Sequence, residues 1–314
     1  MRVTLFHNPE AGDARLTAEQ LSSILSDVGY QVRYQSTKKD WRSALDDLGE
    51  LAIVAGGDGT VAKVAKALAE REVPLAVVPL GTANNIGKAL GAFGEVRTLV
   101  ERWRGTPAAA MDLGVAVGPF GEERFVEAVG GGIFAELIRR GRYEVEHSSA
   151  IVGRETDRAL QLLRGILEEA EAADWQVSLD DYDLSGPYLA IEAMNIGFAG
   201  PNIPLASDAD IGDGELDVVL LREEDRERLL EYVVGRVESA SATMPSLDVR
   251  RGRHLRMVPP AGWPVRIDDE LVDGGPAPDD GSDESPAERD ARVIDVLLRP
   301  RAIRVAGVSD RNGG

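Results

Sequence analysis

The chain has 314 residues, a hydrophobic content of 43% and a formal net charge of -19. This length allows two domains, and so acidic a balance disfavours nucleic-acid binding and electrostatic adhesion to anionic membranes. The absence of cysteine excludes disulfides and thiolate sites. The sequence shows neither an apolar run long enough for a membrane span nor a signal-peptide core. We therefore expect a cytoplasmic protein with at most peripheral membrane contact.

The first third of the chain alternates short apolar runs with helix-like stretches. Strands are expected at Val3–Phe6, Gln31–Gln35, Leu51–Ala55 and Leu75–Pro79, and helices at 15–28 and Val61–Glu70. Continuous apolar runs are typical of parallel strands that are buried on both faces. The alternation therefore predicts an α/β domain, with functional loops at the carboxyl ends of its strands.

Short β-like segments dominate the remainder of the chain. Two helical stretches, near 154–172 and 223–238, interrupt them. We expect an α/β domain over 1–115 and a mainly antiparallel domain over 116–314. Residues 273–290 are rich in Asp, Pro, Gly and Ser, which predicts a disordered acidic loop.

The segment Gly56-Gly57-Asp58-Gly59-Thr60 lies between a predicted buried strand and a helix start. Glycines allow the backbone to approach a ligand closely, and successive N–H groups at a helix N-terminus bind anions. Asp58 has the wrong charge to contact phosphate, so we expect it to hold a metal-bound water or to orient a donor. A tight turn without a ligand is the alternative, but five specified residues in this context favour a phosphate site.

Two other phosphate motifs match only superficially. Gly57-x-Gly59-x-x-Ala62 fits the dinucleotide fingerprint, but the next strand ends in Pro79-Leu80-Gly81 rather than in an acidic residue. The segment from Gly81 to Lys88 resembles a P-loop, but Ala89 replaces the Ser or Thr that would hold Mg²⁺. The three histidines, His7, His147 and His254, lack metal-ligand spacing and are expected at the surface or as capping residues.

Six short segments occur in the order found in the diacylglycerol kinase catalytic family, which includes bacterial lipid kinases and sphingosine kinases. They are Asn8-Pro9-x-x-Gly12, Gly56–Thr60, Pro79–Asn84, Met111–Gly114, Asp213–Asp217 and Asp268-Asp269-Glu270. The chain resembles this family over nearly its whole length. The resemblance implies a Rossmann-like, phosphofructokinase-like nucleotide domain, a C-terminal β-sandwich domain and an active site in the cleft.

The same resemblance implies site residues. Contacts with ATP would come from Asn8, Pro9, Gly12, Thr37, Gly56, Gly57, Asp58, Gly59, Thr60, Thr82 and Asn85. Ser36 is placed as well as Thr37 for this role. Asp213 and the Glu215 carbonyl, with Asp210 nearby, would hold Mg²⁺, because oxygen donors at this spacing can surround a hard cation. A plain acidic turn, or a structural Mg²⁺, is the alternative.

Glu270 aligns with the general base of the family, which accepts the proton of the lipid hydroxyl as that hydroxyl attacks the γ-phosphoryl group. An exposed hairpin tip is the alternative for this acidic segment. The chain also departs from the family at three positions. Asn85 replaces Asp, Lys63 replaces Glu, and Asp269 replaces the glycine that precedes the base. These departures leave the rate and the metal dependence open.

The expected function is therefore an ATP- and Mg²⁺-dependent lipid kinase that phosphorylates diacylglycerol or a related lipid alcohol at a membrane surface. An NAD kinase-like enzyme shares the Gly-Gly-Asp-Gly turn, but its Asn-Glu pair for the ribose has no good match here. A nucleotide-binding sensor with little turnover is a further alternative, suggested by Asn85 and Lys63. The sequence leaves the oligomeric state and the particular lipid undetermined.

Overall fold

The computed structural model describes residues 1–12, 16–147, 155–238, 242–275 and 291–308. The chain forms two compact units. Unit 1 consists of Met1–Leu113, Ile211–Asp213 and Arg299–Gly314, and unit 2 of Gly114–Asp210 and Gly214–Leu298. The first boundary falls between Leu113 and Gly114, and the chain returns to unit 1 twice. Of the expected acidic loop, 276–290 lies outside the described residues.

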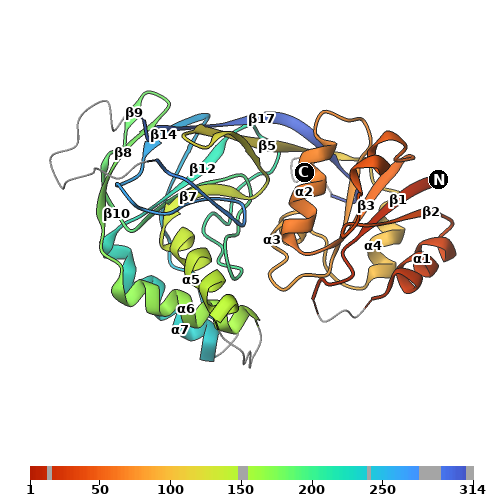
Figure 1. The fold of residues 1–314 in the computed structure, drawn as a ribbon, viewed down its shortest axis with the longest axis horizontal. Helices are drawn as coiled ribbons and strands as arrows, with labels where there is room; N and C mark the ends of the chain where they lie inside the picture. The colour runs from red at the N-terminus through yellow and green to blue at the C-terminus, as the bar shows by residue number, and fades with distance from the viewer. Residues whose placement is uncertain (13–15, 148–154, 239–241, 276–290, 309–314) are drawn as a thin grey trace. The chain divides into compact units, whose positions relative to one another are not determined.

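Unit 1 is built on a parallel sheet in the order β17-β4-β3-β1-β2. Its strands are β1 (Arg2–His7), β2 (Gln31–Ser36), β3 (Leu51–Gly56), β4 (Leu75–Pro79) and the end of β17 (Ile294–Val305). Its helices are α1 (Ala18–Asp27), η1 (Arg42–Asp46), α2 (Asp58–Leu68), α3 (Asn85–Ala89) and α4 (Val96–Arg102), drawn from red to yellow-orange in Figure 1. The α/β fold predicted for this part of the chain is confirmed.

The apolar run of β3 explains why this sheet lies inside unit 1. All six residues of β3 are buried, and successive side chains of a strand point to opposite faces. Helices must therefore cover both faces of the sheet. The helix α1 packs against β2 and α4, whereas α2 packs against β3, β4 and α3.

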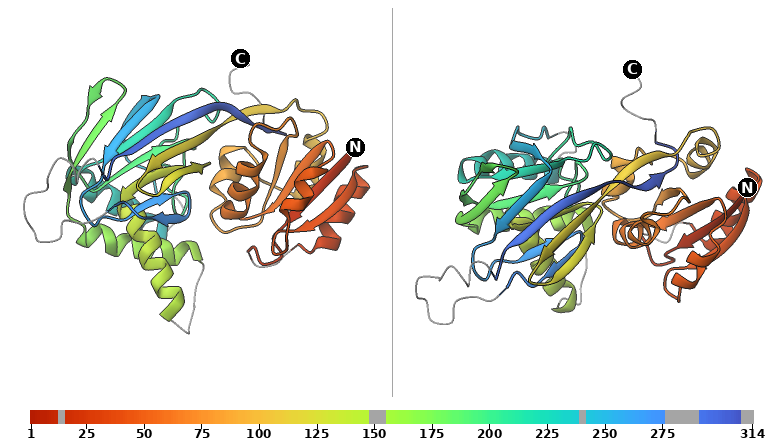
Figure 2. Two further views of the ribbon diagram at one scale, coloured as in Figure 1. Left: turned by 45° about the horizontal axis from the view of Figure 1, so that its top comes forward. Right: turned by 90° about the horizontal axis from the view of Figure 1, so that it is seen from above.

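Unit 2 is a sandwich of two largely antiparallel sheets (Figure 2). One sheet has the order β13-β12-β11-β7-β15-β16, and the other contains β10-β8-β14-β17 with β5, β6 and β9 attached. The first sheet comprises β7 (Ala128–Gly132), β11 (Ala190–Met194), β12 (Leu216–Leu221), β13 (Asp248–Gly252), β15 (Val265–Ile267) and β16 (Glu270–Val272). The second adds β5 (Ala109–Gly118), β6 (Gly121–Phe125), β8 (Ala173–Leu179), β9 (Tyr182–Asp183), β10 (Gly186–Tyr188) and β14 (His254–Val258).

Two apolar cores hold unit 2 together. One lies between the sheets and includes Phe125, Trp175 and Tyr188, all essentially buried. The other joins the outer face of the six-stranded sheet to the helices, with Leu163 and Leu229 among its members. These helices are α5 (Ile133–His147), α6 (Glu155–Glu169), and α7 (Arg226–Glu238) with the short η2 (Glu223–Asp225) before it. The predicted β-sandwich is thus confirmed, with a helical layer on one face.

Two sequence expectations need correction. The helix α5 was not predicted at all, although it is one of the longest helices of the described chain. His7 is 2% exposed, at the end of β1, and is therefore not a surface residue. No helix within the described ranges combines the length and the apolar character needed to cross a membrane.

Candidate functional site

The turn Gly56–Thr60 connects the buried strand β3 to α2, as the sequence predicts. Gly57 is the N-cap of α2 in an extended conformation, and its carbonyl accepts hydrogen bonds from Thr60 and Val61, at 3.0 Å each. Asp58, Gly59 and Thr60 form the first turn of the helix, and no side chain caps it. This places the positive end of an 11-residue helix at the carboxyl edge of the sheet, where an anion is stabilised.

Loops that follow the neighbouring strands meet this turn. The Nδ2 atom of Asn8, directly after β1, donates to Oγ1 of Thr60 at 3.1 Å. Thr37, directly after β2, donates its backbone N–H to the His7 carbonyl at 2.9 Å. Leu80, directly after β4, donates to the Gly56 carbonyl at 2.9 Å. The structure therefore gathers Asn8, Thr37 and the Gly56–Thr60 turn at one edge of the sheet.

Two glycines make this close approach possible. Gly12 has a φ of +60°, and a Cβ there would lie 2.1 Å from the Leu80 carbonyl oxygen. A Cβ on Gly81 would lie 2.5 Å from Cα of Gly57. Side chains at these positions would push the loops apart, so glycine is required for the backbone of one loop to rest on the next.

Asp58 holds two of these loops together. Its carboxylate accepts the backbone N–H groups of Asn85 and Ile86, at 3.0 Å each, at the start of α3. Burial raises the pKa of Asp58, and these hydrogen bonds, with that of Asn84 and the charge of Lys88, act in the opposite direction. The side chain thus orients backbone donors of the next loop.

The remaining predicted nucleotide contacts differ in accessibility. Thr82 is exposed on the loop after β4, and Pro9 is exposed after β1. Asn85 is 3% exposed, so its side chain faces the interior of unit 1 rather than solvent. Asn84 occupies the left-handed backbone region and exchanges two hydrogen bonds with Gly81, which shapes the loop that carries Thr82.

The predicted metal ligands lie in the acidic segment before β12. Burial, followed by the charges of Glu215, Asp208 and Asp210, raises the pKa of the adjacent Asp217 to about 6. Carboxylates of this segment therefore repel one another, and Arg251 lies 3.4 Å from Asp217 and 3.7 Å from Glu215. Oxygen donors suit Mg²⁺ chemically. Within the described ranges, however, three or more acidic or histidine side chains are nowhere arranged to hold a metal.

Glu270 lies in unit 2, at the tip of the hairpin formed by β15 and β16. Ile267 pairs with Glu270, so Asp268 and Asp269 form a two-residue loop. The carboxylate of Glu270 is 55% exposed and lies 2.8 Å from Nη2 of Arg142 on α5. The same nitrogen donates to the Asp269 carbonyl at 2.9 Å. The candidate base is thus held on an exposed hairpin by a cation from a helix that the sequence did not predict.

Buried polar groups support this hairpin from below. Asp268 has a φ of 53°, and its Oδ1 accepts the N–H groups of Val126 and Glu127 at 2.9 and 2.8 Å. Arg266 donates to the Asp268 carbonyl at 2.7 Å and pairs with the buried Glu192 at 2.8 Å. Burial raises the pKa of Glu192, and the Arg266 charge opposes that rise. No local sequence signal marks these partners, because they are far apart along the chain.

The fold and the site define a two-unit protein, in which a parallel sheet presents a glycine-rich turn at a helix N-terminus and a β-sandwich presents a carboxylate on a hairpin. Residues 2–116 match the family model of the diacylglycerol kinase catalytic domain. The N-terminal part of the chain therefore matches a family of lipid kinases.

Similar proteins span both units. A protein of Pseudomonas aeruginosa named probable lipid kinase YegS-like is 29% identical over 279 residues, which are 86% of this chain and 87% of that protein. One of the same name from Pseudomonas putida is 30% identical over 217 residues, covering 68% and 61% of the two chains. Two solved structures from Bacillus anthracis str. Sterne, the second described as a diacylglycerol kinase, share the fold. Their TM-scores are 0.70 and 0.66, and their sequence identities are 17% and 15%. Each alignment covers 98% of this chain, and the aligned parts are 95% and 97% of the two solved chains.

Proposed function

We propose that this chain transfers the γ-phosphoryl group of ATP to the hydroxyl of a lipid alcohol, with diacylglycerol or a related glycerolipid as the acceptor. The observation that carries the proposal is the meeting of the loops after β1, β2, β3 and β4 around the N-terminus of α2. In a member of a lipid kinase family, such an edge supplies the backbone donors that a polyphosphate needs.

The proposed nucleotide contacts are those at this edge. The backbone N–H groups of Gly57, Asp58 and Gly59 bind phosphate oxygens, with Thr60 in the same helical turn. The loops that carry Asn8, Pro9, Gly12, Thr37, Thr82 and Asn85 surround them. Asp58 acts indirectly, because its carboxylate already accepts two N–H groups of the next loop. The backbone thus positions the nucleotide without reorganising, which is the main protein contribution to phosphoryl transfer.

Asp213 and the Glu215 carbonyl, together with Asp210, are the residues we propose to hold Mg²⁺. Their oxygen donors have the right chemistry, and the charges of Glu215, Asp208 and Asp210 add to burial in raising the pKa of the neighbouring Asp217. A bound Mg²⁺ would neutralise charge that develops on the transferred phosphoryl group.

Glu270 is the proposed acceptor of the hydroxyl proton. Arg142 engages its Oε2 atom, so the Oε1 atom is the one we assign to receive the proton. Exposure of this carboxylate fits an acceptor that arrives from outside the protein. The glycine that the family has at position 269 is not needed here, because the positive φ of this loop falls on Asp268.

The test is to incubate the full chain with labelled ATP and Mg²⁺ in three separate reactions. Each reaction contains one candidate acceptor: vesicles of diacylglycerol, sphingosine or NAD. A labelled phospholipid from the diacylglycerol vesicles is the expected product. Product from NAD alone would refute the lipid assignment. Saturable ATP binding without product from any pool would instead favour the nucleotide sensor.

A further inference from the structure

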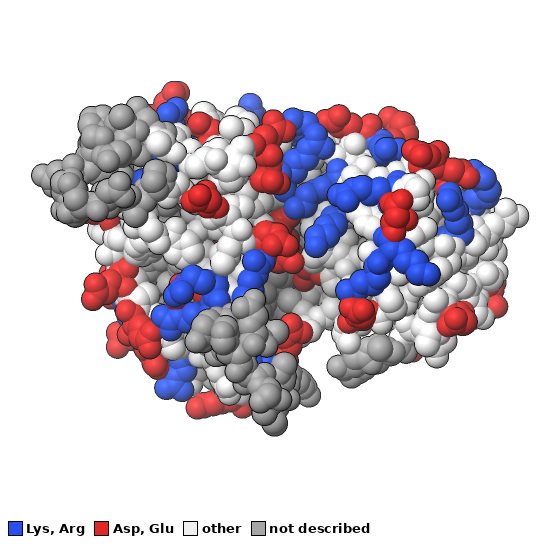
Figure 3. Space-filling model, viewed as in Figure 1, with Lys and Arg blue, Asp and Glu red and all other residues white. Residues whose placement is uncertain are grey.

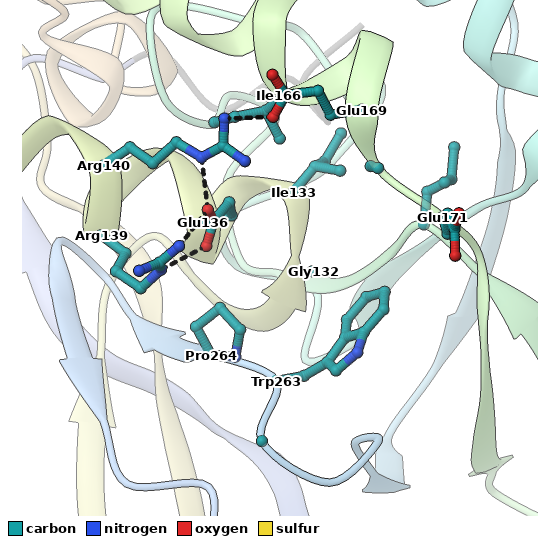
Figure 4. A pocket seen from close by; sticks show the side chains of 13 residues that line it. Gly132, Ile133, Glu136, Arg139, Arg140, Ile166, Glu169, Glu171, Trp263 and Pro264 are labelled. Atoms are coloured by element: carbon teal, nitrogen blue, oxygen red, sulfur yellow. Dashed lines mark hydrogen bonds and ion pairs between the residues drawn. The ribbon is translucent and has the colours of Figure 1, made fainter.

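Unit 2 contains a pocket of about 440 Å³ that the proposed kinase reaction does not use (Figure 4). It lies between the start of α5, the end of α6 and the loop before β15. Small-molecule sites have roughly this size, about 300–1,000 Å³. The pocket is too small for a lipid with two long acyl chains, so its ligand would be a smaller molecule.

One wall of the pocket is a closed network of charges. Glu136 accepts hydrogen bonds from Arg139 and Arg140 at 2.6 Å, and Arg140 also donates to Glu169 at 2.8 Å. Burial raises the pKa of Glu136, but the hydrogen bonds and charges of the two arginines outweigh it and keep the pKa below its usual value. Both guanidinium groups are therefore already neutralised, and this wall does not offer a cation to an anionic ligand.

The opposite wall is aromatic and apolar. Trp263 and Pro264 face the charged wall across the pocket in Figure 4. Ile133 and Ile166, from the two helices that carry the charges, and Leu189 also line the pocket. The Trp263 ring is fixed from behind by an edge contact with the buried Trp175, with 5.9 Å between ring centroids. Its backbone N–H also closes a turn to the Pro260 carbonyl at 3.1 Å. The indole is thus held in place before any ligand arrives.

Glu171 adds a further carboxylate to the lining, beyond the network of Glu136 and Glu169. The charge of Glu171 contributes to the raised pKa of the nearby Arg226. That guanidinium, however, is paired with Glu223 at 2.6 Å and donates to the carbonyls of Leu167 and Ala170. Counting these groups as ionised, four carboxylates face three guanidinium groups. The surroundings have the same sign, because unit 2 holds 38 acidic and 18 basic residues. The pocket therefore attracts cations and repels anions.

We infer that this pocket binds a small organic cation with an apolar body. The ammonium group lies between the Glu171 carboxylate and the Trp263 indole, and the apolar body packs on Ile133, Ile166 and Leu189. A carboxylate and an aromatic ring in the lining of one pocket suit an alkylated ammonium group, because the negative face of the ring attracts the cation. This binding does not depend on the proposed kinase activity.

The probe we choose is octyltrimethylammonium, titrated into the full chain by isothermal calorimetry below its aggregation concentration. Octyl sulfate and 1-octanol carry the same chain with a negative or a neutral head. We expect one saturable site for the cation, with a Kd at least about tenfold lower than for either comparison compound. Equal binding of octyl sulfate or octanol, or no saturable binding of the cation, would overturn the inference.

Two variants test the assigned residues. Glu171→Gln and Trp263→Leu should each raise the Kd of the cation by about five- to tenfold. Glu168→Gln is the matched control, because it removes the same charge from α6 but pairs with Arg164 outside this pocket. If Glu168→Gln weakens binding as much as Glu171→Gln, the effect is a general field and the site is wrong. Should Trp263→Leu fail to fold, the comparison of Glu171→Gln with Glu168→Gln still tests whether the cation binds in this pocket.

Discussion

The ion pair between Glu270 and Arg142 joins two residues 128 positions apart in the chain. Both side chains are about half exposed, at 55% and 47%, so the pair contributes little to stability. Its effect is on geometry, since Arg142 also binds the Asp269 carbonyl and so holds the end of the loop next to Glu270. If Glu270 is the base, this contact keeps its carboxylate in one orientation while one lipid molecule leaves and the next one binds.

Glu270→Gln should lower kcat about 10²–10⁴-fold and leave the Kd of ATP within about twofold, because only the proton acceptor is lost. Steady-state kinetics and ATP titration measure the two effects. Asp269→Asn is the control, since it removes the same charge from the hairpin, and Arg142 binds the carbonyl of that residue rather than its carboxylate. Unchanged kcat in Glu270→Gln would refute the role of the base.

His7 shows a second effect at the residue scale. It is buried at the end of β1, and burial lowers its pKa from 6.5, an effect that Glu19 partly opposes. The unfolded chain then binds the proton more readily than the folded chain. The free energy of unfolding should therefore fall as the pH decreases below about 6.5 and the histidine of the unfolded state becomes charged.

Urea unfolding at pH 7.5 and at pH 5.5 should show this dependence. His7→Gln should reduce the loss of stability between the two pH values, because the titrating group is gone. Parallel pH profiles for wild type and His7→Gln would contradict the assignment.

At the scale of elements, the nucleotide edge depends on loops that touch through their backbones. Gly81→Ala puts a Cβ 2.5 Å from Cα of Gly57, which cannot move without displacing α2. We expect the variant to lose about 1–3 kcal/mol of stability and to bind ATP at least about tenfold more weakly. Gly105→Ala, where a Cβ meets nothing within 4 Å, should change neither quantity noticeably. Normal ATP affinity in Gly81→Ala would show that the loops do not have to touch.

The β15–β16 hairpin offers a second comparison between neighbouring positions. Asp268 has a left-handed backbone that glycine would adopt without strain, but its carboxylate holds two buried N–H groups. Asp268→Gly should therefore destabilise the protein by about 2 kcal/mol, because the lost hydrogen bonds outweigh the relieved strain. Asp269→Gly should change stability by no more than about 0.5 kcal/mol. Urea unfolding of both variants tests the order, and the reverse order would disprove it.

At the scale of the whole molecule, the net negative charge of the chain belongs to unit 2. Unit 1 contains 17 basic and 16 acidic residues, whereas unit 2 contains 18 basic and 38 acidic residues. Figure 3 shows Lys and Arg gathered on unit 1 over α2, where Lys63 is exposed. The composition of the whole chain argued against any electrostatic contact with anionic surfaces. That argument holds for unit 2 alone.

Repulsion within unit 2 predicts a dependence on salt. Raising NaCl to about 0.5 M should screen these charges and increase Tm by about 2–4 °C, which corresponds to about 1 kcal/mol for a domain of this size. Calorimetric scans across a salt series measure the shift. Glycerol, which carries no charge, serves to separate screening from general solvent effects. A Tm that falls or stays constant with salt would contradict the expected repulsion.

The sequence by itself determined the parallel sheet and the phosphate turn of unit 1. The apolar run of β3 and the glycines after it are local signals, since a strand buried on both faces and a helix start with bare N–H groups need only neighbouring residues. The ordered segments also predicted the family that residues 2–116 match, whereas the role of Glu270 stays a prediction.

Only the tertiary structure decided which distant groups support these elements. The helix α5 escaped prediction because its sequence is rich in charge and contains Gly141, so packing on the sheet stabilises it more than local propensity does. The return of Arg299–Gly314 to unit 1, the Arg142–Glu270 pair and the pocket at Trp263 share this origin. Each depends on contacts between segments far apart in the chain, and no local pattern of residues encodes such contacts.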